Sequence, residues 1–192
     1  MIMEKTFKPF IQHLEHEIED EDKAYAILEK TVPLVGWVVL YFNTLEKSVD
    51  QQICEHISDR SDSLGLIVIN GLHYNAKVEM LKRMCDDLHK ACGKVPPTYK
   101  DLIENLREAG RIRNSIVHAD WMNTDEEGYT FMKMNITVNG MKQEYIQFSE
   151  ESLNRFMREL TVYNHQLSDY SEQKGNLLSH GYCTIEEIEA NK

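Results

Sequence analysis

Apolar residues recur every three or four positions over most of the 192-residue chain, and this spacing places them along one side of an α-helix. The pattern predicts a mainly α fold, a helical bundle of about five helices. Thr31 followed by Pro33 marks the start of the second helix, since proline fits a first turn. The run Leu64 to Ile69 is too short to separate a buried strand from a helix. The predicted helices cover residues 6–30 (a helix that the acidic cluster 19–22 can interrupt), 31–58, 70–92, 98–121 and 149–170.

The helical spacing gives way to a different pattern between residues 129 and 148. Two stretches rich in Tyr, Thr, Met, Val and Ile flank Asn139-Gly140, the dipeptide typical of a type I′ hairpin turn. A lone hairpin is marginally stable, so this one must pack against the rest of the protein. We expect a single domain over residues 1–192, with a β-hairpin insert at about 128–148. A tail at about 172–192 holds at most a short helix after Thr184.

The charge of the chain is uneven. The 32 acidic and 21 basic residues give a formal charge of −11, which argues against a protein that coats duplex DNA through a broad basic face. Residues 63–113 differ, with nine bases and six acids, whereas residues 1–62 and 114–192 each carry 13 acids and six bases. An anion-binding site is therefore expected in this middle third or at its end.

The four cysteines show neither a C-x-x-C pair nor zinc-ribbon spacing, which favours free thiols in a reducing cytoplasm. The longest apolar run, Val32 to Phe42, is about half the length that a membrane span needs, and no secretory leader opens the chain. We therefore predict a soluble, cytoplasmic protein with no membrane contact.

Two other groups of chemically reactive side chains have ordinary structural explanations. His13 and His16 share a predicted helical face, but no third and fourth metal ligands accompany them. Cys85 and His89 are one turn apart, yet Cys85 lies on an apolar stripe and is expected to be a small core residue. The chain also lacks the glycine-rich motifs that bind nucleotide cofactors, so we expect neither a metal nor a cofactor.

Arg113 is the exception on the inward side of the fourth predicted helix. The other positions on that line are apolar: Leu102, Leu106, Ala109 and Ile116. A guanidinium that faces inward is costly unless it meets a carboxylate, a phosphate or a water-lined cleft. Arg113 therefore has a structural partner, for which Glu46 is one candidate, or a function.

His118 and Asn114 follow Arg113 closely enough to form one polar site. On a helix, Arg113 and His118 are ~7.5 Å apart along the axis and ~140° apart around it. A neutral imidazole can take the proton of a ribose 2′-hydroxyl, and a guanidinium can neutralise charge that develops on a phosphoryl oxygen. Asn114 can orient either group. Such a set suits metal-independent RNA cleavage that leaves a 2′,3′-cyclic phosphate and spares DNA.

The segment from Arg111 to Trp121, which contains R-N-S-I-V-H, resembles the motif of the HEPN family (higher eukaryote and prokaryote nucleotide-binding domain). In that family an Arg, commonly followed by Asn, precedes a His by four to six residues on a late helix. The resemblance covers residues 30–170 in helix order and implies a HEPN-like bundle. It also implies that Arg113 and His118 are catalytic residues of a ribonuclease toxin or antiviral defence effector, with Asn114 as their polar neighbour.

One His and one Arg provide no acid that could protonate the oxygen that leaves the phosphorus during cleavage. The nuclease hypothesis therefore predicts a homodimer whose two fourth helices face each other, so that a second copy of the site supplies this acid. An antitoxin or another regulatory protein is a further partner that the resemblance implies. In one toxin subgroup the motif ends His-x-Tyr, and a nucleotidyltransferase antitoxin modifies the Tyr. Asp120 occupies that place here and is instead a candidate supporting residue. The alternative function is a non-catalytic HEPN-like module for dimerisation or for binding a nucleotide or protein.

Overall fold

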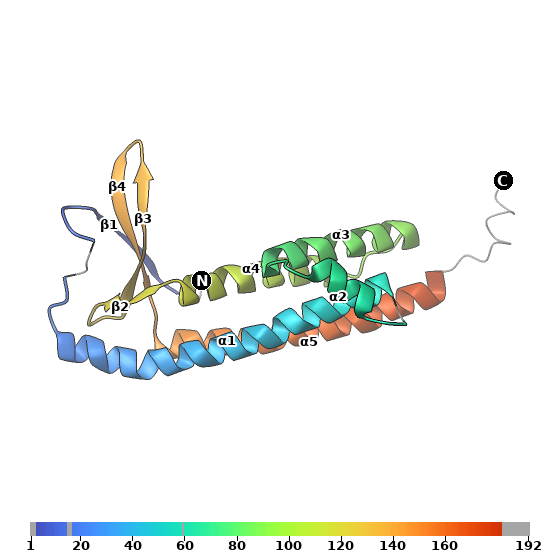
Figure 1. Cartoon of the computed structure of the whole chain (residues 1–192), viewed down its shortest axis with the longest axis horizontal. Helices are drawn as coiled ribbons and strands as arrows, with labels where there is room; N and C mark the ends of the chain where they lie inside the picture. Colours follow the sequence, from blue (N-terminus) through green and yellow to red (C-terminus); the bar gives the residue numbers. More distant parts are fainter. Residues whose placement is uncertain (1–2, 15–16, 59, 182–192) are drawn as a thin grey trace, which may run out of the picture. The chain divides into compact units, whose positions relative to one another are not determined.

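The computed structural model describes residues 3–14, 17–58 and 60–181, which form five helices and one four-stranded sheet (Figure 1). It confirms the predicted mainly α fold with a hairpin before the last long helix. In chain order the elements are β1 (Lys5–Pro9), α1 (Glu21–Ile57), α2 (Ser63–Ile69), α3 (Tyr74–Cys92), α4 (Tyr99–Val117), β2 (Asp120–Thr124), β3 (Tyr129–Thr137), β4 (Gly140–Gln147) and α5 (Glu150–Gly181).

The chain falls into two compact units, each built from two separate stretches of sequence. Unit 1 comprises Met1–Asn43 and Arg111–Thr161, and unit 2 comprises Thr44–Gly110 and Val162–Lys192. Unit 1 contains the whole sheet together with the end of α4, whereas unit 2 contains α2 and α3. Helices α1, α4 and α5 each supply residues to both units.

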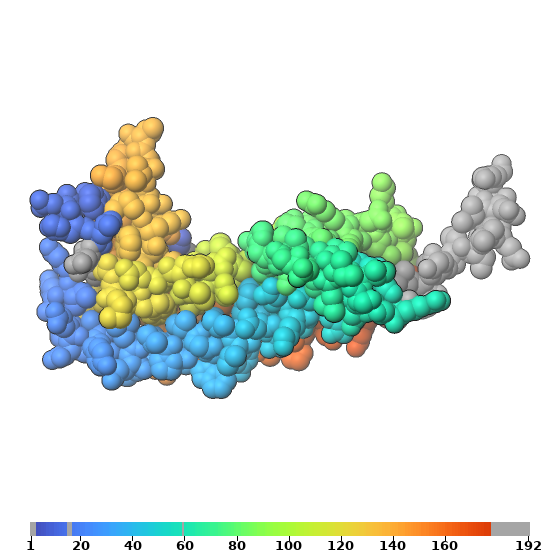
Figure 2. Space-filling view, in the orientation of Figure 1, coloured from blue at the N-terminus to red at the C-terminus, as the bar shows by residue number. Residues whose placement is uncertain are grey.

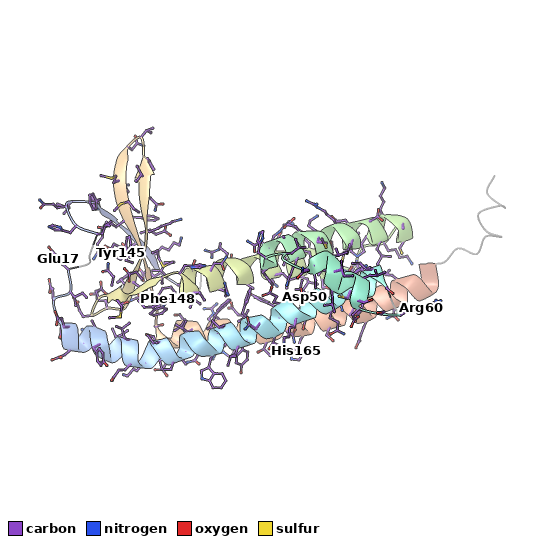
Figure 3. All side chains as sticks on the ribbon, in the orientation of Figure 1. Glu17, Asp50, Arg60, Tyr145, Phe148 and His165 are labelled. Carbon is purple, nitrogen blue, oxygen red and sulfur yellow. The ribbon has the colours of Figure 1, made fainter. Side chains whose placement is uncertain are left out.

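The sheet of unit 1 is antiparallel throughout, in the order β1-β4-β3-β2. Its base is packed with aromatic rings: Phe131 lies 5.7 Å from Tyr145, and Trp121 lies 4.8 Å from Phe148, between ring centroids. Tyr145 and Phe148 are each 1% exposed and lie at the base of the sheet in Figure 3. The Trp121 indole Nε1 also donates to the Ile116 carbonyl of α4 at 2.8 Å, so the aromatic base of the sheet is tied to a helix.

The hairpin forms where it was predicted, but its turn lies one residue earlier than expected. Thr137 pairs with Gly140, so Val138 and Asn139 occupy the two central positions of the turn. Neither has a positive φ, whereas Gly140 has φ 108°. The type I′ prediction is therefore wrong, because only the glycine after the turn needs the left-handed region.

The prediction of a helix over residues 6–30 is wrong for the described residues before Glu21 and right for residues 21–30. Residues Lys5–Pro9 form strand β1, whose partner β4 lies more than 130 positions later in the sequence. Helix α1 begins only at Glu21, where Asp20 Oδ1 accepts a hydrogen bond from the backbone N–H of Lys23 at 3.0 Å. The acidic cluster thus starts a helix, as expected from an aspartate cap, and does not interrupt one.

Helix α1 also continues through the predicted start at Thr31 and Pro33, and both residues lie inside it. Proline removes one backbone donor from a helix interior. The Oγ1 of buried Thr31 donates to the Ile27 carbonyl at 2.9 Å, so this turn keeps a side-chain hydrogen bond. The predicted end near Ser58 agrees with the last helical residue, Ile57.

Within unit 2, the ambiguous segment after Ser63 is a helix, α2. Gly65 lets it lie directly against α1, because a Cβ at this position would be only 2.6 Å from Cys54 Cα. Helix α3 has the apolar stripe predicted for it, with Val78, Leu81 and Cys85 each at most 1% exposed. It ends at Gly93, which adopts φ 65° as the left-handed cap.

The ends of the last two long helices differ from the prediction. Helix α4 stops at Val117 instead of continuing to Trp121, because Asp120 already pairs with Phe131 in the sheet. Helix α5 starts where Ser149 predicted it, and the Ser149 Oγ accepts a hydrogen bond from the Ser152 N–H at 3.1 Å. It extends to Gly181, so the first part of the predicted tail is helical, and the short helix after Thr184 lies outside the described residues.

Candidate functional site

Arg113 is half-buried near the end of α4, where it lies over an aromatic ring. Its guanidinium carbon is 5.3 Å from the centroid of Phe42, a fully packed residue of α1. Its Nη1 donates to Asn114 Oδ1 at 3.1 Å, and its Nε is buried without a hydrogen-bond partner. Within the described residues no carboxylate pairs with Arg113. The guanidinium is therefore held by a ring face and a neutral amide, which leave its charge uncompensated.

His118 is exposed and immediately follows the last residue of α4. Its backbone N–H still donates to the Asn114 carbonyl at 3.0 Å, so helical geometry extends to this position. Asn114 therefore lies one helical turn before His118, as the sequence predicts, and its side chain contacts Arg113. In the part of the chain that the structure describes, no side-chain contact joins the His118 imidazole to Arg113, so only a bound substrate could bridge the two groups.

The backbone around His118 is fixed by Trp121. The Trp121 indole Nε1 donates to the Ile116 carbonyl at 2.8 Å, and its ring packs on Phe148. Ile116 itself is fully buried. The hydrogen bond closes a short loop that contains His118, so the junction between α4 and β2 is anchored on both sides. Such support suits a residue that must hold a defined position.

The two candidate supporting residues have other positions. Asp120 is exposed at the start of β2, outside the helix that carries Arg113. Glu46 lies in unit 2, where its Oε1 accepts from Lys77 Nζ at 2.8 Å. Lys77 also pairs with Asp50 at 2.9 Å, so Glu46 is part of an ion-pair cluster around a lysine.

The cysteine and histidine groups of unit 2 are structural. His89 Nε2 is 3.0 Å from the Tyr170 hydroxyl, and Cys85 Sγ is instead near His56 Nε2, at 3.6 Å. Burial raises the pKa of the Cys85 thiol to about 11 and lowers the pKa of His56 to about 4. A buried neutral thiol beside a half-buried neutral imidazole is not an activated nucleophile.

No cluster of three or more His, Cys, Asp or Glu side chains suited to a metal ion occurs in the described ranges. His16, one of the two histidines considered above, lies outside them.

Helix α1 carries an unusual amount of exposed apolar surface. It is the one helix of the described chain long and apolar enough to cross a membrane, a criterion that core helices of soluble proteins also meet. This is weak evidence for a span and is consistent with a soluble protein. Only 17% of the most apolar 18-residue window is buried, so this stretch presents apolar side chains outward. The exposed large residues are Tyr25, Val32, Trp37, Leu40 and Tyr41.

No protein-family model, curated protein sequence or solved structure matches the chain significantly. The site therefore has to be interpreted from its own geometry. The sequence indicates Arg113 because it is the one charged residue among apolar positions on the inward side of its helix. It gives no sign that the guanidinium lies over the ring of Phe42. Phe42 ends the apolar run from Val32, and nothing local in the sequence relates positions 42 and 113.

Proposed function

We propose that the protein is a metal-independent endoribonuclease of the HEPN type, with His118 as general base and Arg113 as the group that stabilises the phosphoryl charge. His118 takes the proton of a ribose 2′-hydroxyl, and the resulting oxygen attacks the adjacent phosphorus. The bond from phosphorus to the 5′-oxygen breaks. The products are a 2′,3′-cyclic phosphate and a free 5′-hydroxyl. Asn114 orients the guanidinium through its amide oxygen.

The uncompensated charge of Arg113 carries this proposal. A purely structural arginine at an inward position is expected to pair with a carboxylate, and no carboxylate meets Arg113 in the described chain. Stacking on Phe42 orients the guanidinium without neutralising it, so its outer N–H groups remain suited to bidentate binding of a phosphate. The exposed imidazole of His118, about one and a half helical turns further along the chain, supplies the base that such a phosphate site requires.

The departing 5′-oxygen needs a proton that one copy of the site does not supply. A second copy related by a twofold axis brings another His118, which can donate this proton when protonated. The proposal therefore includes a homodimer in which the two α4 ends share one groove. The biological setting, a toxin or an antiviral effector with an antitoxin or regulator as partner, rests on the resemblance to the HEPN family.

We expect purified protein to cut single-stranded RNA in the presence of excess EDTA and to leave single-stranded DNA of the same sequence intact. The physical reason is that the mechanism uses the 2′-hydroxyl as nucleophile and no metal. Mass spectrometry of the fragments should show cyclic phosphate termini. Loss of cleavage on chelation, restored by Mg²⁺, would contradict the proposed mechanism.

A second candidate, a non-catalytic dimerisation module, is favoured by the exposed apolar face of α1. Trp37 and Leu40 are 53% and 57% exposed, and residues 31–45 carry no charge in a chain of net charge −11. Two copies of an acidic protein can approach closely where neither carries charge. Trp37 and Leu40 are rotated roughly 140° and 160° around α1 from Phe42. A dimer through this face would therefore leave its Arg113 side chains outside the interface.

Replacing Trp37 and Leu40 together by Gln tests this second candidate. If α1 forms the dimer interface, size-exclusion chromatography with light scattering should show a dimer for the parent and a monomer for the double variant. The thermal midpoint should change little, because both side chains are already exposed. Val95→Gln, at a 62% exposed position in a loop, is the matched control and should leave the mass unchanged. A double variant that stays dimeric and cleaves RNA would exclude the α1 interface.

A further inference from the structure

One face of the sheet in unit 1 carries lysines around an exposed aromatic ring. In antiparallel strands, directly opposed residues point to the same side. The register places Phe7, Glu144 and Lys133 in one row across β1, β4 and β3, and Pro9, Lys142 and Asn135 in the next. We call this side of the sheet the lysine face. Its polar and aromatic members are Lys5, Phe7, Lys133, Asn135, Lys142 and Glu144.

These strands are basic, although the protein is acidic. Together β1, β3 and β4 contain four lysines and one carboxylate. Without Lys8, whose side chain points to the other side of the sheet, the lysine face has a net charge of +2 in a chain of −11. In the middle third of the sequence, where an anion site was expected, Lys77 is paired with Glu46, Lys82 with Asp86, and Arg107 with Glu79, whereas Arg113 at its end keeps an uncompensated charge. The sheet is thus a local positive surface suited to a polyanion.

Glu144 is a buried carboxylate of the lysine face that holds two of its lysines in place. It is 5% exposed and forms ion pairs with Lys5 and, at 3.6 Å, with Lys133, while Asn135 Nδ2 donates to its Oε2 at 3.0 Å. Burial alone would raise the pKa of this carboxyl. The hydrogen bonds from Lys5 and Asn135, together with the two lysine charges, outweigh burial and lower the pKa. One carboxylate thus positions two ammonium groups and cancels only one of their charges.

Phe7 gives this basic surface an apolar stacking position. Its ring is 52% exposed on the edge strand β1, in the same row as Glu144 and Lys133. An exposed aromatic ring flanked by cationic side chains is the combination that binds single strands without reading sequence, because every base has a face that can stack. An acidic peptide would use the lysines but would gain little from the ring. The β3–β4 hairpin also projects from the rest of unit 1 in Figure 2, which leaves room for a strand beside it.

We propose that the lysine face binds single-stranded RNA, with a base stacked on Phe7 and backbone phosphates on Lys133 and Lys142. This inference rests on the proposed ribonuclease function, since it concerns the substrate of the same site. The same sheet reaches that site: β2 begins two residues after His118 and pairs with β3. RNA on the lysine face would therefore be held by the unit that carries Arg113 and His118.

Fluorescence anisotropy with a labelled 12-nucleotide RNA tests the binding. All binding variants carry His118→Ala, which prevents cleavage during the measurement. Because His118 is exposed, this substitution should not disturb folding. Phe7→Leu keeps an apolar side chain but removes the stacking face, and it should weaken binding by about 5- to 100-fold. Lys142→Gln should lower the slope of log affinity against log salt by about 0.7, the value for one phosphate contact on a single strand.

Lys8→Gln is the matched control. Lys8 is on the same strand as Phe7 but points to the opposite side, where its Nζ lies 5.3 Å from the centre of the Tyr145 ring. It removes the same charge as Lys142→Gln and should leave affinity and salt slope nearly unchanged. Equal effects of the two substitutions would mean that only net charge matters, which would overturn the assignment to one face. Unchanged binding in Phe7→Leu, with full competition by poly-glutamate, would replace RNA by an acidic protein as the ligand.

Cleavage assays on the same substitutions in the His118-containing protein separate this inference from the proposed function. Binding that depends on Phe7 and Lys142, in a protein that cuts no RNA, supports the lysine face and rejects the nuclease. Cleavage by the parent that is unaffected in both KM and kcat by Phe7→Leu supports the nuclease and rejects the lysine face.

Discussion

Replacing His118 by alanine should reduce RNA cleavage by at least about 100-fold while the protein stays folded. General base catalysis contributes roughly 10²- to 10⁴-fold to a rate, and alanine has no group that can take a proton. The side chain is exposed beyond the end of α4, so its removal creates no cavity. Single-turnover cleavage of a labelled RNA measures the loss, and thermal unfolding and light scattering measure stability and oligomeric state.

The matched control for this substitution is His165→Ala. His165 is an exposed histidine on α5 (Figure 3), and its removal should leave the cleavage rate unchanged. Equal activity of the His118→Ala variant and the parent would reject His118 as the base. A large fall in the thermal midpoint of His118→Ala would instead assign the histidine a structural role near the helix C-terminus.

Replacing Gly65 by alanine should destabilise the protein strongly, by about 2 kcal/mol or more. The new Cβ would lie 2.5 Å from Cys54 Sγ and 2.6 Å from Cys54 Cα, and the second of these atoms belongs to the backbone of α1. A backbone atom cannot rotate away as a side chain can, so α2 must move off α1. Urea unfolding measures the loss, and hydrogen exchange of residues 63–69 should show whether α2 opens first.

Gly175→Ala provides the control for this prediction. Gly175 is also inside a helix, α5, but a Cβ there would meet nothing within 4 Å. Alanine is the better helix former, so this variant should be more stable than the parent by up to about 1 kcal/mol. A similar loss in both variants would show that the contact with Cys54 is not what requires glycine at position 65.

The parts of the fold that the sequence predicts well are those whose signals are local. Gly93 ends α3 because the chain needs a left-handed residue there, and Ser149 starts α5 through hydrogen bonds with Ser152, three residues away. Asn139-Gly140 located the hairpin for the same reason, although only Gly140 adopts a positive φ. Each signal acts within one turn of chain and is visible in a single sequence.

The errors arise where a distant partner decides the structure. Phe7, Ile11 and Leu14 have helical spacing, yet the backbone of residues 5–9 pairs with β4 and forms a strand. Pro33 looked like a helix start, but α1 begins earlier, at Glu21, and passes through it. The candidate site likewise has one part that local sequence predicts and another that depends on distant residues. The position of Arg113 followed from its own helix, whereas its contact with Phe42 and the neighbouring lysine face depend on pairings far along the chain.

The pairing of β1 with β4 has a consequence for how the protein is made. Lys5–Pro9 are translated more than 130 residues before their partners, Lys142–Ile146. Strand β1 must therefore wait without its neighbour while the intervening residues are made. A nascent chain that has not yet extended past Gln147 cannot complete the lysine face, so RNA binding there would begin only after β4 has been translated.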